Sequence, residues 1–167
     1  QDSEGDTYNK AITYPWPMIR LSELYLMYAE SLNESSGPSL EVYDALNEIR
    51  QRAGIPSVQD AWSNATFAAT PNKHLSQEGL REIIQQERMI ELAFEGHRYY
   101  DIRRWKLAEK YFTTPIKGWS VDEDSEANYY QIMEVSQRSF RSPRDYFQPI
   151  SFTELSRNPN LVQNPGW

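Results

Sequence analysis

Four acidic residues and four arginines lie between residues 87 and 105, in the stretch ERMIELAFEGHRYYDIRRW. The acidic side chains are Glu87, Glu91, Glu95 and Asp101, and the basic ones are Arg88, Arg98, Arg103 and Arg104. Two carboxylates that flank a glycosidic bond can hydrolyse it, so the cluster raises the question of a glycosidase. It equally suits a structural role, because the carboxylates and the arginines are equal in number.

The spacing within this cluster favours the structural role. Glu87, Glu91 and Glu95 are four residues apart and therefore share one face of a helix. A carboxylate beside an arginine stays ionised with a depressed pKa, which suits an ion pair better than a general acid. We therefore expect a buried or half-buried ion-pair network where one helix passes into the next at Gly96, and no catalytic residue.

Metal-dependent chemistry has few candidate ligands. The chain has two histidines, His74 and His97, and no cysteine, so a zinc site would need carboxylates as its other ligands. The run DEDSE places oxygens at Asp122 and Asp124 as a calcium loop would, but Ala127 stands where such a loop needs glycine. We expect a solvated acidic loop and no cofactor, with a loose calcium site at these two aspartates as the alternative.

Aromatic residues are better candidates for ligand contacts. The chain has five Trp and eleven Tyr, more than a core of this size needs. Sugar rings present apolar C–H faces that stack on Trp and Tyr, and partly exposed aromatic rings offer such surfaces. The candidates in loops and at the start of an expected strand are Trp62, Trp119, Tyr129 and Tyr130. For both tryptophans an equally good interpretation is a loop anchor folded back onto the core.

Composition excludes some functional classes. At 167 residues the chain is long enough for one domain with a sizeable core. Its net charge of −7, with arginines interleaved among acids, argues against nucleic-acid binding, which needs a basic stripe. No apolar run approaches the roughly 20 residues of a membrane span. The chain begins with Gln1 rather than methionine, so we expect a fragment or a processed product.

Hydrophobic periodicity predicts a mainly α-helical fold with a small extended C-terminal part. We expect a lead-in over 1–16, a first helical hairpin over 17–54, a loop over 55–75, a second hairpin over 76–113, and an extended or irregular segment over 114–167. Pro17 is a suitable helix start, Gly54 a stop, and Ser76 an N-cap. The two hairpins suggest a tetratricopeptide-like stack, although a free-standing stack needs about three repeats.

Four segments resemble the C-terminal portion of SusD/RagB-like outer-membrane proteins. In order they are PMIRLSELYLMYAESLNE, ALNEIRQRAGIP, ERMIELAFEGHRYYDIRRW and PISFTELSRNPNLVQNPGW. The resemblance implies a non-enzymatic surface lipoprotein that binds nutrient glycans, or peptides in some members, and delivers them to a SusC-like TonB-dependent transporter. It also implies a tetratricopeptide-like scaffold at the cell surface, held to the outer membrane only by a lipid anchor.

Two departures limit what the resemblance implies. Family members are several times longer and begin with a lipid-bearing Cys, so the N-terminal part with that anchor is expected to be absent here. The family's ligand-contacting aromatics lie largely in that part, so no binding site is carried over. Alternatives are a peptide-binding member and a scaffold segment whose ligand site lies elsewhere; a glycosidase is the least favoured.

Overall fold

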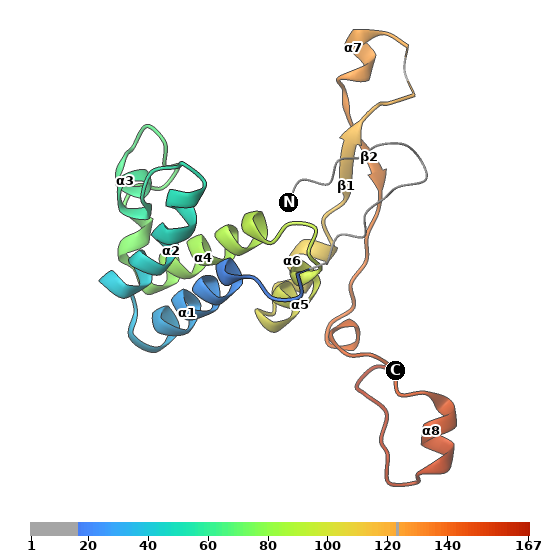
Figure 1. Ribbon diagram of the computed structural model, residues 1–167. Coiled ribbons are helices and arrows are strands. Elements are labelled where there is room, and N and C mark those ends of the chain that lie inside the picture. The colour runs from blue at the N-terminus through green and yellow to red at the C-terminus, as the bar shows by residue number, and fades with distance from the viewer. Residues whose placement is uncertain (1–16, 123) are drawn as a thin grey trace, which may run out of the picture. The chain divides into compact units, whose positions relative to one another are not determined.

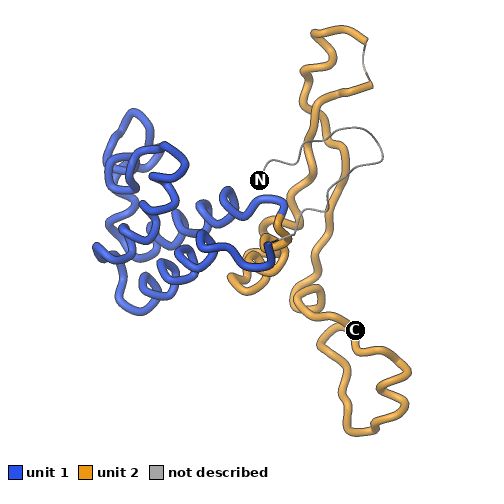
Figure 2. The backbone as a smooth tube through the Cα atoms, viewed as in Figure 1, with its two compact units in different colours: residues 1–94 blue, residues 95–167 orange. Residues whose placement is uncertain are grey.

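The computed structural model describes residues 17–122 and 124–167, and the chain divides into two compact units, residues 1–94 and 95–167 (Figures 1 and 2). Helices dominate, and a two-stranded sheet is the β structure of the described residues. The predicted fold class, mainly α with a small β and irregular C-terminal part, is confirmed. Within the described residues no helix is both long and apolar enough to cross a bilayer.

The first unit is built on three helices, α1 (Leu21–Ser36), α2 (Leu40–Arg52) and α4 (Gln77–Glu91). Helix α1 packs against both α2 and α4, and the three helices share one core (Figure 1). The side chains at the centre of this core are almost wholly buried, among them Leu26, Leu46, Leu80, Ile83 and Ile84. Burying each such side chain contributes about 1.5–3 kcal/mol.

Serine caps set the starts of these helices. The hydroxyls of Ser39 and Ser76 accept hydrogen bonds from backbone N–H groups three residues on, at the starts of α2 and α4. Each such cap satisfies one amide that the helix itself cannot pair. The expected start of α1 at Pro17 is wrong, because the backbone stays extended at Arg20 and the helix begins at Leu21.

The segment 55–75 contains more structure than its lack of periodicity indicates. It holds a short helix, α3 (Val58–Ser63), and a 3-10 turn, η1 (Lys73–Leu75). Elements this short have room for only one or two core contacts, here Val58 and His74, so no repeating pattern announces them. Both elements pack within the first unit, α3 on α2 and η1 on α4.

The second unit begins with α5 (His97–Arg104) and α6 (Ala108–Phe112). The sequence pattern indicated no break in this part of the second expected hairpin, but the chain turns at Lys106, which has a φ of 56°. Strands β1 (Ile116–Trp119) and β2 (Ile132–Ser136) then form an antiparallel hairpin, with the short helix α7 (Glu126–Tyr129) in its connection. The chain continues through the turn η2 (Arg144–Tyr146) and helix α8 (Phe152–Arg157).

The turn-rich C-terminal tail is held by specific contacts to residues 144–150. The Trp167 indole N–H donates to the Arg144 carbonyl at 3.1 Å, and the Arg144 guanidinium lies 4.4 Å from the centre of that indole ring. The Gln163 amide exchanges two hydrogen bonds with the backbone of Ile150, at 2.9 and 3.0 Å. These contacts order a segment that has no regular secondary structure after α8.

Candidate ligand-binding site

Three of the four predicted ligand-binding aromatics form one cluster, which we call the aromatic platform: Trp119, Tyr129 and Tyr130. The Trp119 ring centre lies 6.0 Å from that of Tyr129 and 5.3 Å from that of Tyr130, and the two tyrosines are 5.2 Å apart. Trp119 is 53% exposed and Tyr130 is 57% exposed, whereas Tyr129 is half-buried. The platform therefore offers apolar ring faces to solvent while each ring braces the other two.

The hairpin brings these residues together. Trp119 ends β1 and pairs with Ile132 of β2, and the Ser120 amide donates to the Gln131 carbonyl at 3.2 Å. The expectation that Tyr129 and Tyr130 open a strand is wrong, because they lie at the C-terminal end of α7. That helical turn, with the Tyr129 amide bonded to the Ser125 carbonyl at 2.8 Å, folds both tyrosines back toward Trp119.

The connection next to the platform is acidic. Asp122, Asp124 and Glu126 are exposed, and Lys117 is the basic residue of the two strands. Across residues 17–122 and 124–167, no three histidine or carboxylate groups come close enough to hold a metal ion. The two histidines also belong to different units, and His74 is buried at 3% exposure.

Trp62, the fourth predicted aromatic, belongs to the first unit. It is half-buried, packs against the helical core, and has the Lys73 ammonium 5.6 Å from its ring centre. It also lines a 450 Å³ groove that includes Phe67 and Ile90. The sequence left two interpretations of Trp62 open, a ligand contact and a loop anchor. Its packing on the core is compatible with the anchor, and its place in the lining of the groove is compatible with the ligand contact.

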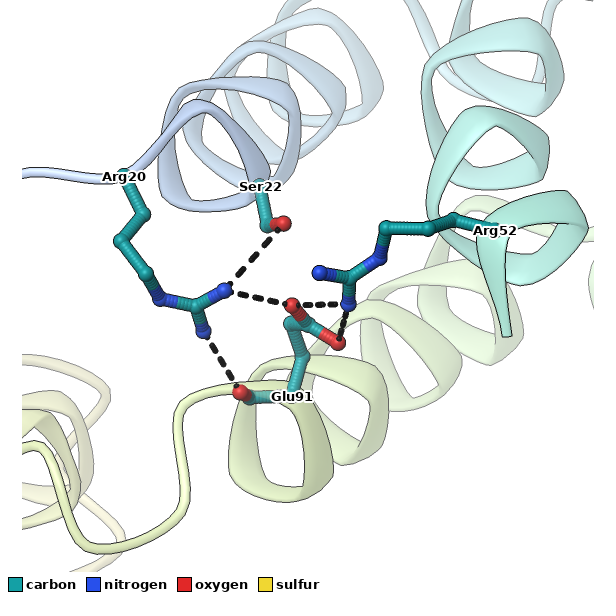
Figure 3. A network of polar contacts seen from close by, with 4 residues as sticks. All are labelled: Arg20, Ser22, Arg52 and Glu91. Atoms are coloured by element: carbon teal, nitrogen blue, oxygen red, sulfur yellow. Dashed lines mark hydrogen bonds and ion pairs between the residues drawn. The ribbon is translucent and has the colours of Figure 1, made fainter. Parts of the chain in front are cut away.

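Two acidic residues of the opening stretch, Glu87 and Glu91, find their partners on other elements of the first unit. Glu91, at the end of α4, accepts hydrogen bonds from Arg20 at 2.9 Å and from Arg52 at 2.6 and 2.7 Å (Figure 3). Arg20 also donates to the Glu91 backbone carbonyl at 2.8 Å and approaches the Ser22 hydroxyl at 3.5 Å. This network ties together the start of α1 and the ends of α2 and α4.

Two other members of the stretch also pair across helices. Glu87 forms an ion pair with Arg50 of α2, and the buried Arg88 lies 4.0 Å from Glu30 of α1. Within the stretch, Asp101 and Arg104 are paired at 2.9 Å.

Three of the four arginines of the stretch rest on aromatic rings, among them Arg104, whose guanidinium lies 4.6 Å from the Trp105 ring centre. The Arg98 guanidinium lies 4.4 Å from the Tyr111 ring centre and that of Arg103 lies 3.6 Å from Tyr99, as cation–π contacts do. Glu95 is half-buried and opens the second unit. The pairing thus differs in part from the one that the sequence suggested, which was confined to residues 87–104: only the pair of Asp101 with Arg104 lies inside that range among the pairs described here.

The missed partners of Glu87 and Glu91 are Arg20, Arg50 and Arg52. One of them had a sequence signal, because Arg50 follows Val42 and Leu46 at intervals of four on the apolar face of α2. A charge on such a face must find a partner inside the fold. Arg20 and Arg52 flank helices as ordinary exposed arginines do, and their sequence positions carry no comparable signal.

The electrostatics of Glu91 argue against a general acid. Burial by itself raises the pKa of the Glu91 carboxyl, but hydrogen bonds from Arg20 and Ser22 act in the opposite direction. The positive charge of Arg52 adds to them, and the net result is a pKa below the ordinary value of 4.5. A general acid must carry a proton near neutral pH, so this carboxylate is a structural tie.

This depressed pKa predicts a pH-dependent stability. Since folded Glu91 binds a proton less readily than unfolded Glu91, its contribution is complete above pH 4.5 and is lost as the pH falls below it. Glu91→Gln should lower the free energy of unfolding at pH 7 by about 1.5–3 kcal/mol, the usual value of hydrogen bonds to a charged group. Urea unfolding of both proteins at pH 7 and pH 3 should show the difference shrinking at the lower pH; an unchanged difference would contradict the assignment.

Comparison with known proteins identifies the family to which this helical chain belongs. The sequence matches the family model described as "SusD family" over residues 2–167. The chain belongs to the SusD family. A SusD-like protein of Formosa agariphila, P2, is 35% identical to it over 164 residues. That alignment covers 98% of this chain and 28% of the relative.

The fold of this chain is also similar to solved structures of SusD-like proteins. A SusD-like protein of Bacteroides fragilis matches with a TM-score of 0.72 and 31% identity, over 91% of this chain and 26% of that one. A SusD-like carbohydrate binding protein of the same species matches with a TM-score of 0.65 and 34% identity, over 87% and 28%. This SusD-family chain therefore spans little more than a quarter of the length of the relatives it matches.

Proposed function

We propose that this chain contributes to the binding of nutrient glycans at the cell surface, without turning them over. The observation that carries the proposal is the aromatic platform, whose two exposed rings suit the C–H faces of sugars. The solved relative described as a carbohydrate binding protein supports the ligand class. Delivery to a SusC-like TonB-dependent transporter, and attachment to the outer membrane through a lipid anchor, follow from the family resemblance.

The environment of the carboxylates supports the proposed absence of turnover. Glu87 and Glu91 are the pair that a glycosidase would need on α4, and both are bound by arginines. The pKa of the Glu91 carboxyl is held below its ordinary value, so this carboxylate has no proton to give to a leaving group. We expect incubation of the protein with any bound oligosaccharide to release no shorter product on chromatography.

Replacing Trp119 by alanine tests the platform. Loss of one stacking face should weaken glycan binding about tenfold, corresponding to about 1.4 kcal/mol. Titration calorimetry or affinity electrophoresis against a panel of neutral oligosaccharides measures the effect. The matched control is Phe152→Ala, which removes another exposed aromatic ring of the second unit, on α8, and should leave binding unchanged.

The same panel separates the alternatives. Peptides that bind while every glycan fails would favour a peptide-binding member of the family. Full glycan affinity in a Trp119→Ala, Tyr130→Ala double variant would place recognition elsewhere, and this segment would then serve as scaffold. Either result would overturn the platform as the glycan site.

A further inference from the structure

A second feature of residues 95–167 has the chemistry of a ligand site. A groove of 470 Å³, which we call the basic groove, is lined by Arg103, Arg104, Lys106, Ser142, Pro143, Tyr146 and Phe147. Its volume falls within the range of small-molecule sites, about 300–1,000 Å³. Three of the seven lining side chains are cationic and none is acidic, while proline and two aromatic rings supply an apolar wall.

The arginines of the groove are held in place by their surroundings. The Arg103 guanidinium lies 3.6 Å from the Tyr99 ring centre and 5.3 Å from that of Phe112. Its hydrogen bonds to the carbonyls of Tyr99 and Asp145 are both long, at 3.4 Å. The contact with the Tyr99 ring therefore holds the guanidinium in place while leaving donor capacity for a stronger acceptor, which the oxygens of an anionic group would provide.

Lys106 occupies a backbone position that normally favours glycine. Its amide bonds to the Arg103 carbonyl at 3.0 Å and the next amide bonds to the Ile102 carbonyl at 2.8 Å, which closes α5 as a Schellman motif does. At φ 56° a residue with a Cβ is unfavourable, and the corresponding stop after α2 is Gly54 at φ 70°. A lysine at this position goes against the preference of the left-handed backbone for glycine. Residues held in such unfavourable conformations are concentrated at functional sites.

The Lys106 side chain also has capacity to bind. Among the described residues its ammonium makes no ion pair or hydrogen bond, and the side chain is exposed at the groove. Arg104 is different, because its Nε donates to Asp101 at 2.9 Å. The groove thus combines an oriented guanidinium, a second guanidinium that is paired with Asp101, and an ammonium available to a ligand.

We propose that the basic groove binds the carboxylate or sulfate group of an anionic saccharide, with its ring against Tyr146 and Phe147. The inference rests on the proposed glycan-binding function and adds a ligand class to it. Arg103 and Lys106 pair with the charged group, and Phe147, 45% exposed, offers the apolar surface. The aromatic platform does not suit this role, because the exposed Asp122, Asp124 and Glu126 beside it repel anions.

The test compares matched saccharides on the purified full-length protein. Titration calorimetry with trigalacturonate, with a sulfated galactotriose and with neutral galactotriose identifies the charged group that is recognised. We expect at least one anionic trimer to bind about tenfold more tightly than the neutral one, and this preference to fall as salt is raised. Equal affinities for all three trimers would overturn the proposal.

Lys106→Asn is the sharpest variant. Asparagine tolerates the left-handed backbone and removes the charge, so the fold is retained and the anionic preference should fall about tenfold. Arg157→Gln removes an exposed charge of α8 that does not line the groove and should change nothing.

The outcomes separate this inference from the glycan-binding function. An unchanged preference in Lys106→Asn, with neutral binding that still depends on Trp119, overturns the basic groove alone. Anionic binding that depends on Lys106, together with neutral binding that is unchanged in Trp119→Ala, supports the groove and overturns the platform. If the protein binds none of the saccharides, both the basic groove and the aromatic platform are overturned as glycan sites.

Discussion

Glu87→Gln is expected to lower the free energy of unfolding by about 3 kcal/mol, the cost of stranding one partner of a buried ion pair. Its partner Arg50 is 8% exposed and also donates to the Pro56 carbonyl at 2.7 Å, so the guanidinium cannot turn to solvent without losing that contact as well. Chemical denaturation monitored by circular dichroism measures the change.

Two variants make this prediction specific. Glu34→Gln makes the same substitution in an ion pair with Arg81 that is about 40% exposed, and it should cost no more than about 1 kcal/mol. Removing both buried charges, in Arg50→Met with Glu87→Met, should restore much of the loss, because apolar pairs often replace buried ion pairs without penalty. If Glu87→Gln costs no more than Glu34→Gln, the pair is not structural.

Gly79→Ala should also destabilise the protein, by about 3 kcal/mol, the upper end of typical overpacking costs. Gly79 lies in the first turn of α4, where alanine would ordinarily gain about 1 kcal/mol from helix propensity. A Cβ at this position would, however, lie 2.0 Å from the Lys73 backbone oxygen and 2.8 Å from the Ser76 hydroxyl. The turn η1 would have to move, together with the buried His74 that it positions.

Gln86→Ala is the matched control for this substitution. Gln86 is exposed on the same helix, so its replacement should change stability by less than about 0.5 kcal/mol. A Gly79→Ala protein that is as stable as the wild type, or more so, would show that propensity outweighs the close approach of the 73–76 turn.

The helices of the first unit illustrate what could be predicted. Helices α1, α2 and α4 are 13 to 16 residues long, so their apolar periodicity extends over several turns, and Ser39 and Ser76 mark two of their starts. The break between α5 and α6 was not predictable in the same way, because Lys106 stands where a glycine would have signalled it. The division of the chain at residues 54, 75 and 113 stays a prediction.

The candidate sites also contain a part that the sequence could predict and a part that it could not. Trp119, Tyr129 and Tyr130 were chosen for their residue types, but only the hairpin and α7 decide that the three rings meet. The basic groove had no sequence signal, since its walls come from segments about forty residues apart. Residue type and local spacing are properties of the sequence, whereas proximity over such distances depends on the fold.

The sequence by itself determined the helical class, the family resemblance and the density of charge around residues 87–105, because these depend on composition and on short periodic intervals. The tertiary structure decided which charges pair. Arginine side chains are long and flexible, so local spacing permits many partners, and helix packing selects among them. It places Arg50 on Glu87, where both side chains are largely shielded from water, and it places Arg20 and the more exposed Arg52 on Glu91.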